Sequence, residues 1–597
     1  MVSPSGTPVA GPSIRTSTGS ASRSITHHQN NQTQKLPDTN IENSSKSSHH
    51  DTPPSGPRKP FNRSWRFWAI ILSLSIMALC GTVEATIIIN ALPTIVADLG
   101  GGSAYLWIPN AFLLASVAVL PLYSQLSDIF GRRYLLLGAV SLFILGSGLC
   151  GAASSMGMLI AARAVAGLGS GGIEMLVETV VTDLVPLRER SKYESLVLTG
   201  SLVGCTIGPF LGGVIVVKLG WRWIFYLNVI LGGASLLMLF VFLKVKHRRN
   251  QTLISRLKRI DIGGNAIFIG SVVAVLLALT WGGPVYRWDS FRIVLPLVLG
   301  LLGLFVFTAF EWTPKLAPEP SFPRALLSNR TSAAALMQSF ILSILTFCFL
   351  PVYFQGILGK SPLGSGIAIV PISACVVPFC IVGGVALSKF GRYKPIHFIS
   401  WAILIVGLGL CSLLDRNSST AAWACFEIVC SAGIGLVTPT LLPAVQAPLE
   451  ERYVATSTGL WSVTRGFGSI WGVTIPSVIF TNEVRRYSDS INDVSIAERL
   501  ANGQAYELAT KAFLDSIADE TVRDQVISVF TRAIKTVWYV GIAVAGLGLL
   551  VVFVQREVKL RQEMPETEFG MDDGRPASRT AATDEIPLED LTARRYE

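Results

Sequence analysis

The sequence predicts an all-α integral membrane protein with 14 transmembrane helices, and three observations support this. The chain has 597 residues, of which 50% are hydrophobic and only 15% charged, whereas soluble domains carry about 25% charged residues. Its mean hydropathy is +0.51. Long stretches contain no Asp, Glu, Lys, Arg or His, among them Leu99–Ser127, Thr331–Gly359 and Ser361–Ser388. About 20 apolar residues cross a bilayer as a helix, so each stretch is long enough.

The predicted spans follow from apolar segments separated by short polar turns. They are Phe67–Ala91, Ala104–Gln125, Tyr134–Ala153, Met156–Thr182, Glu194–Val217, Trp221–Leu243, Gly263–Gly282, Arg292–Trp312, Ser332–Gln355, Gly364–Leu387, Ile396–Leu414, Ala421–Val445, Val454–Thr481 and Ala533–Val554. The turn between the third and fourth spans depends only on Ser154–Gly157. Residues 483–532 are amphipathic and charged, so we expect a long loop there instead of a span.

Both ends of the chain are polar, and the loops between spans differ in charge. Residues 1–66 are rich in Ser, Thr, Pro, Asn and Gln and predict a disordered tail. No apolar stretch precedes Phe67, so we expect the first span to act as its own insertion signal. Alternate short loops are rich in Lys and Arg, which places both termini in the cytosol. We expect the plasma membrane, with the vacuolar membrane as the alternative.

Several functional classes are excluded by composition. The nine cysteines lie mostly in apolar runs without metal-ligand spacing, and no histidine lies deep in a span. The net charge of +10 comes from basic residues scattered at span ends, which is not a nucleic-acid-binding pattern. Nor does the chain carry a nucleophile motif. We therefore expect no metal, no organic cofactor, no nucleic-acid partner and no enzymatic activity.

The turn between the second and third spans carries the first motif. Gly131 permits a sharp reversal, and Asp128 can pair with Arg132 or cap a neighbouring helix. The alternative is a simple basic anchor in which Arg132 and Arg133 hold the turn in the cytosol. The order of residues resembles the cytoplasmic signature of the major facilitator superfamily, with Ser124 in place of its first glycine.

A stripe of glycines in the fifth predicted span forms the second motif. These glycines recur every four residues, so they share one face on which another helix can pack closely. They are Gly200, Gly204, Gly208 and Gly212, with Pro209 and Gly213 beside them. A plain packing stripe is the alternative, but Gly208-Pro209 and Gly212-Gly213 resemble the signature of antiporters in this superfamily.

Two ionisable residues lie inside the first and fourth spans. Residues 83–93 resemble the first-span signature of drug:proton antiporters, with Glu84 where that group usually has Asp. Residues 159–169 resemble the superfamily's fourth-span motif, which contains Arg163. An unpaired Glu84 would bind a proton, as a proton carrier must. The alternatives are a permanent ion pair of Glu84 with Arg163, and an Arg163 that snorkels to the interface.

Further charged residues lie inside predicted spans. Glu174 and Glu178 are four residues apart, so they share a helix face and could share one proton. The alternative is a face that lines water near the cytosol. Glu427 and Arg465 are the remaining buried charges, and Arg465 lies in 455–472, which resembles the thirteenth span of 14-span drug antiporters.

The resemblance to 14-span drug:proton antiporters of the fungal efflux-pump type implies a domain organisation. It implies two six-helix bundles with an inserted helix pair between them. The expected parts are 67–244 (N-terminal bundle), 245–261 (basic cytosolic linker), 262–331 (inserted pair and loop), 332–555 (C-terminal bundle, with an external loop at 483–532) and 556–597 (cytosolic tail).

The same resemblance implies a function. We expect a monomer in the lipid bilayer that exports a small amphipathic organic compound (a drug, toxin or secondary metabolite) by alternating access, with the proton gradient as its only coupling partner. Siderophore or nutrient transport and a non-transporting sensor on the same fold are the alternatives. Asn417 is a glycosylation sequon in a loop that we expect outside.

Overall fold

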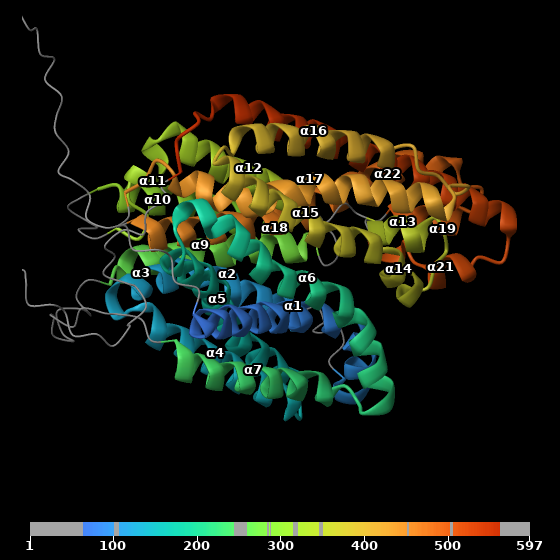
Figure 1. Cartoon of the computed structure of the whole chain (residues 1–597). Coiled ribbons are helices and arrows are strands. Elements are labelled where there is room, and N and C mark those ends of the chain that lie inside the picture. The colour runs from blue at the N-terminus through green and yellow to red at the C-terminus, as the bar shows by residue number, and fades with distance from the viewer. Residues whose placement is uncertain are drawn as a thin grey trace, which may run out of the picture. The chain divides into compact units, whose positions relative to one another are not determined.

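The chain folds into long helices, described here from a computed structural model (Figure 1). The structure describes residues 64–100, 107–243, 260–282, 286, 288–313, 320–345, 350–450, 453–501 and 505–560. Most of the predicted N-terminal tail 1–66, almost all of the basic linker 245–261 and most of the C-terminal tail lie outside these residues. The last two residues of the predicted tail, Trp65 and Arg66, are helical. Within the described residues there is no strand, only an isolated bridge between Gly282 and Tyr286.

The helices up to residue 243 begin and end at recognisable signals. They are α1 (Trp65–Leu99), α2 (Trp107–Ala118), α3 (Leu120–Phe130), α4 (Arg132–Gly151), α5 (Met156–Leu184), α6 (Leu187–Lys218) and α7 (Arg222–Phe242). Ser155 accepts a hydrogen bond from the Met158 amide at the start of α5, as N-cap residues do. Gly131 has a φ of 87° between α3 and α4, a conformation that favours glycine.

The remaining helices follow after residue 260. They are α9 (Ile262–Trp281), α10 (Phe291–Glu311), α11 (Ala325–Ser328), α12 (Arg330–Leu345), α13 (Leu350–Gly356), α14 (Pro362–Ala368), α15 (Val370–Phe390), α16 (Lys394–Cys411), α17 (Thr420–Gln446), α18 (Val454–Tyr487), η3 (Ser488–Ser490), α19 (Val494–Arg499), α20 (Ala505–Leu508), α21 (Lys511–Asp515) and α22 (Glu520–Val554).

The all-helical membrane fold is confirmed, but the number of spans is not. Within the described residues, 11 helices are long and apolar enough to cross a membrane, or 12 if the bent pair α2–α3 forms one span. Two further predicted spans coincide with α6 and α18, which are 32 and 34 residues long but do not belong to this set. The count of 14 therefore stays a prediction.

The expected long loop at 483–532 is largely helical. α18 continues to Tyr487, the 3-10 helix η3 and the short helices α19, α20 and α21 follow, and α22 begins at Glu520, well before the predicted span at Ala533. Asp519 caps α22 by accepting a hydrogen bond from the Thr521 amide. Charged residues made this segment too polar for a span, but they do not prevent helices that extend beyond an apolar core.

Helices before residue 243 pack mainly against one another, and we call α1–α7 the N-terminal bundle. α1 lies against α6 and α7, while α5 lies against α2 and α4. The C-terminal bundle, α12–α22, contains a second apolar core that includes Trp401, Phe480 and Trp538. α9 of the inserted pair contacts α2, α10 and α18.

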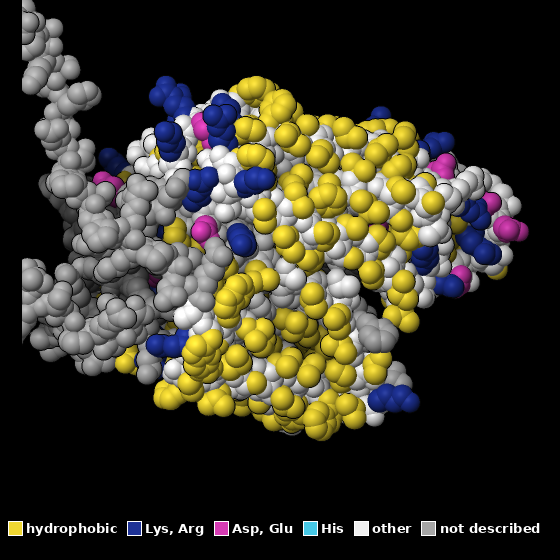
Figure 2. All heavy atoms as spheres, in the orientation of Figure 1, with side chains coloured by type: hydrophobic (Ala, Val, Ile, Leu, Met, Phe, Trp, Pro, Cys, Tyr) yellow, Lys and Arg dark blue, Asp and Glu magenta, His cyan; other side chains and the backbone are white. Residues whose placement is uncertain are grey.

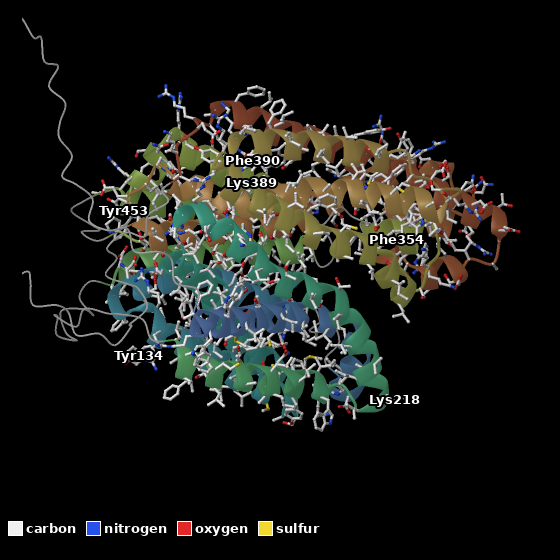
Figure 3. The ribbon with its side chains drawn as sticks, viewed as in Figure 1. Tyr134, Lys218, Phe354, Lys389, Phe390 and Tyr453 are labelled. Carbon is white, nitrogen blue, oxygen red and sulfur yellow. The ribbon has the colours of Figure 1, made fainter. Side chains whose placement is uncertain are left out.

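The helix flanks are apolar and the helix ends are charged. Hydrophobic side chains cover the flanks, and Lys and Arg gather toward the ends (Figure 2). One end of the helical bundles carries Arg132 at the start of α4, Arg188 at the start of α6 and Lys389 at the end of α15. We call it the basic end. Tyr134 and Tyr453 lie toward this end, and Lys218 and Phe354 toward the opposite end (Figure 3). The charge rule predicts that the basic end is cytosolic.

Candidate functional site

A fully buried ion pair joins α1 to α5 within the N-terminal bundle. The Glu84 carboxylate accepts hydrogen bonds from the Arg163 guanidinium and from the Asn228 amide of α7. Arg163 also donates through Nε to the Ile108 carbonyl at 2.9 Å, and its guanidinium lies 4.3 Å from the centre of the Phe112 ring. Glu84 is 0% exposed and Arg163 is 1% exposed. The site therefore satisfies a buried charge on both sides.

This geometry separates the alternatives that the sequence left open. Arg163 does not snorkel, because its side chain is buried and directed at Glu84. Glu84 is not an unpaired carboxyl, because it lies in the ion pair that was the alternative interpretation. Asn228 was missed by the sequence analysis. The signal was present, since it is the only amide side chain in the uncharged segment Trp223–Leu243.

The glycine stripe of α6 is a close packing surface against α1. A Cβ atom built on Gly200 would collide with the Ser75 carbonyl, and one on Gly208 would collide with the Thr86 hydroxyl. A Cβ atom on Gly204 would likewise collide with Thr82, and one on Gly212 would lie 2.7 Å from the Ile87 carbonyl oxygen. Pro209 and Gly213 lie in the same helix. The stripe thus holds α6 on the helix that carries Glu84.

The Gly131 turn forms a charge cluster at the basic end. Arg132 is 4% exposed, pairs with Asp128 at 3.0 Å and donates through Nε to Asp183 of α5 at 2.8 Å. It also donates to the Ser127 carbonyl at 2.8 Å. Arg133 instead donates to the Phe240 carbonyl at the surface. The motif therefore ties α3, α4 and α5 together, which is more than a basic anchor would do.

Polar contacts between the two bundles gather at the basic end. Thr456 of α18 donates to Asp128 at 3.2 Å. Arg190 of α6 donates to the Gln446 side chain of α17 at 2.7 Å. Arg188 donates to the carbonyls of Ser388 and Lys389 at 2.8 and 2.9 Å. Ser195 donates to the Cys380 carbonyl of α15 at 2.9 Å. The bundles are therefore held together at this end.

Two of the predicted buried charges meet across the bundles. Glu178 of α5 lies 3.9 Å from Arg465 of α18, whose guanidinium lies 4.4 Å from the centre of the Trp461 ring. Glu174, one turn earlier on α5, is exposed, so the two glutamates do not share one environment. Glu194 of α6 joins Glu178 in this region. From the sequence, Glu194 is predicted only as the first residue of a span.

The last two predicted residues lie apart from these clusters. Glu427 of α17 is 1% exposed, and its carboxyl group lies beside the Ile372 backbone of α15. Lys360 interacts with it electrostatically. Asn417 is exposed in the turn between α16 and α17, as glycosylation would require.

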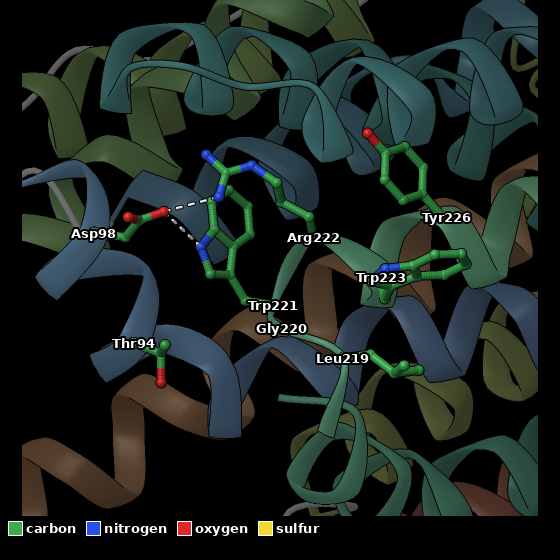
Figure 4. A pocket seen from close by; sticks show the side chains of 8 residues that line it. All are labelled: Thr94, Asp98, Leu219, Gly220, Trp221, Arg222, Trp223 and Tyr226. Carbon is green, nitrogen blue, oxygen red and sulfur yellow. Dashed lines mark hydrogen bonds and ion pairs between the residues drawn. The ribbon is translucent and has the colours of Figure 1, made fainter. Parts of the chain in front are cut away.

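A surface pocket of about 580 Å³ lies between the end of α1 and the start of α7 (Figure 4). Asp98 accepts hydrogen bonds from the Trp221 indole at 3.0 Å and from Arg222 at 2.8 Å. These two donors lower the pKa of the Asp98 carboxyl below its usual range. None of the residues predicted as a site lines this pocket. The residues that line the pocket are Thr94, Asp98, Leu219, Gly220, Trp221, Arg222, Trp223 and Tyr226.

Comparisons with known proteins agree with this architecture. The model of the Major Facilitator Superfamily matches residues 74–473. The chain is 49% identical over 521 residues to the MFS-type transporter ucsD of Acremonium sp, covering 87% of this chain and 88% of that protein. It is 40% identical over 536 residues to the efflux pump FUS6 of Gibberella fujikuroi, covering 89% of this chain and 96% of that protein.

A solved structure supports the fold alone. The human organic anion transporter MFSD10 (TETRAN) aligns with 83% of this chain and 100% of its own, with a TM-score of 0.54 and 15% sequence identity. The family match covers more than half of the chain, and the relatives align along most of their length. The chain therefore belongs to the major facilitator superfamily and is a multi-pass membrane transporter.

Proposed function

We propose that this transporter exports a small amphipathic organic compound, such as a secondary metabolite, by alternating access in exchange for protons. The observation that carries the proposal is the set of charged residues buried inside the helices, above all Glu178 facing Arg465 across the two bundles. Ionisable groups inside a membrane are costly and mark ion pathways and proton relays. Relatives named as efflux pumps support the direction of transport.

The contacts at the basic end support a rocking mechanism. Asp128, Arg188 and Arg190 join the bundles there. With the basic end in the cytosol, this is a conformation closed to the cytosol. Opening must break these hydrogen bonds, and each bond to a charged group contributes about 1.5–3 kcal/mol. A substrate or proton that binds the two conformations with different affinity shifts the balance between them.

The N-terminal bundle would move as a rigid body in this mechanism. The Glu84–Arg163–Asn228 cluster joins α1, α5 and α7, and the glycine stripe joins α6 to α1. Both contacts lie within one bundle, so they can persist through the cycle. We assign to both contacts the role of holding the bundle together. We further propose that the transporter acts in the plasma membrane.

Export is tested by accumulation of labelled candidate compounds in cells with and without the chain. We expect lower accumulation when the chain is present, and a protonophore should abolish the difference. Higher accumulation in cells that carry the chain would indicate uptake, as in a siderophore or nutrient transporter. Equal accumulation of every compound that reaches the cells would favour a sensor.

A further inference from the structure

Two buried carboxyl groups, those of Glu178 and Glu194, lie where α5 and α6 meet the C-terminal bundle. The two residues are 6% and 2% exposed. Glu178 lies 3.9 Å from Arg465 of α18. Both carboxyl oxygens of Glu194 are buried and accept no hydrogen bond from any donor among the described residues. A carboxylate this deeply buried without a donor is costly unless it carries a proton.

The relation between the two carboxyl groups indicates where that proton lies. They are within hydrogen-bonding reach of each other. Ionised carboxylates only accept hydrogen bonds, so Glu178 and Glu194 can be bonded to each other only when one is protonated. Two like charges this close in a buried site also disfavour ionisation of both. The arrangement therefore fits a pair that holds one proton.

Charged and titratable groups surround Glu194 from every helix that contributes to this region. They are Arg190 on its own helix, Glu178 on α5 with Glu174 one turn away, Arg465 on α18 and the Cys380 thiol on α15. Arg190 is already bonded to the Val185 carbonyl and to Gln446. Arg465 thus brings to Glu178 a positive charge from the opposite bundle. Glu174 is exposed and lies on the side away from the basic end.

We propose that Glu178 and Glu194 share one exchangeable proton and that this pair, together with Arg465, is the proton-coupling site of the transporter. The inference rests on the proton-coupled function proposed above. The proton passes from water on the side away from the basic end to a carboxylate oxygen of the pair. It returns to water on the other side when the bundles part at the basic end.

The charge of the pair determines which conformation is favoured. With the proton bound, the pair carries one negative charge, the two carboxyl groups are hydrogen-bonded, and Arg465 supplies one balancing charge. Without the proton, two carboxylates would be buried side by side, which favours a conformation in which water reaches them. Proton binding therefore closes the basic end, and proton loss opens it.

The test is the pH dependence of this conformational balance in the full-length protein, in phosphatidylcholine nanodiscs without substrate. Spin labels introduced through non-natural amino acids replace Tyr134 and Phe390, which are 58% and 67% exposed and lie on opposite bundles. Pulsed electron paramagnetic resonance then gives the populations with short and long label separation. For one proton, their ratio changes by up to about tenfold per pH unit.

We expect the wild-type ratio to shift toward the short separation as the pH falls. Glu194→Gln and Glu178→Gln should each reduce the change to less than about twofold across the range in which carboxyl groups and histidines titrate. Glu194→Asp keeps an acid and should keep the slope with a displaced midpoint, which a purely structural role would not produce. Glu498→Gln, at an exposed carboxyl in the other bundle, should behave as wild type.

The outcomes separate this inference from the function on which it rests. A wild-type slope that persists in Glu194→Gln and Glu178→Gln overturns the carboxyl pair and leaves proton-coupled export standing. A wild-type protein whose populations ignore pH overturns both. Loss of the slope in both Gln variants, with retention in Glu194→Asp and Glu498→Gln, supports the pair as the coupling site.

Discussion

The ion pair between Glu84 and Arg163 yields a prediction about stability whose magnitude follows from its burial. Arg163→Met removes the guanidinium and leaves Glu84, which is 0% exposed, with the Asn228 amide as its one remaining partner among the described residues. Removing one partner of a buried pair costs about 3–5 kcal/mol, because the other charge stays buried without compensation. We therefore expect the free energy of unfolding to fall by that amount in Arg163→Met.

Substitution of the other partner, Glu84→Gln, should lower the free energy of unfolding by less. In Glu84→Gln, Arg163 keeps the Ile108 carbonyl and the face of the Phe112 ring. The double variant Glu84→Gln/Arg163→Met buries no charge, so it should be more stable than Arg163→Met alone. In double-mutant cycles, contacting residues show interaction energies of about 0.5–3 kcal/mol, and we expect the upper half of that range for Glu84 and Arg163.

The assay is unfolding of the purified protein in mixed micelles with rising denaturing detergent, followed by tryptophan fluorescence. Arg133→Met is the matched control, since among the described residues this arginine donates at the surface to the Phe240 carbonyl and lies near the Tyr134 and Phe240 rings. It should change the free energy by less than about 1 kcal/mol. Single-variant effects at Glu84 and Arg163 that simply add in the double variant would refute the reasoning.

Three further predictions concern packing, the basic end and topology. Gly208→Leu should destabilise the N-terminal bundle by about 1–3 kcal/mol, because its side chain would collide with α1; thermal unfolding measures this, with Gly233→Leu as a control at a position with open space. Asp128→Ala should slow turnover roughly tenfold while substrate binding persists, since it removes a charged hydrogen bond between the bundles. Val494→Thr creates a glycosylation sequon at an exposed position between α18 and α22, which should be modified in cells, whereas Asn250 should not.

Each of these predictions has an outcome that contradicts it. Equal stability of Gly208→Leu and Gly233→Leu would mean that α1 and α6 do not pack as closely as the structure places them. Unchanged turnover in Asp128→Ala would reduce the Gly131 turn to an anchor. Glycan at Asn250 would reverse the orientation and with it the assigned direction of transport.

The sequence predicted the helical membrane fold because bilayer insertion depends on the local composition of each segment. Uncharged runs therefore located the apolar helices with good accuracy. The sequence allowed Asp128 either to pair with Arg132 or to cap a neighbouring helix, and the structure contains the pairing. The predicted start of the last helix, Ala533, was wrong for the same reason, because α22 begins at Glu520. Its first turns after Glu520 are charged but amphipathic, with Val522, Val526 and Phe530 buried at helical spacing, so the helix continues beyond the apolar segment.

The candidate site was less predictable because its contacts join helices that are far apart in the chain. Arg465 and Glu178 are separated by 287 residues, and no local pattern shows that they face each other. Glu194 looked like the boundary of a span, since a carboxyl at the start of an apolar run is common there. Only the packing of α6 against α5 and α15 shows that it is buried.

The measurement that tests proton-coupled export most directly uses proteoliposomes that contain the purified full-length chain and a pH-sensitive dye. A labelled compound whose accumulation depends on the chain in cells is added on one side. We predict that its movement drives protons in the opposite direction, and that an imposed pH gradient accelerates its movement. Movement of the compound without any proton flux, at a rate indifferent to the gradient, would contradict the account.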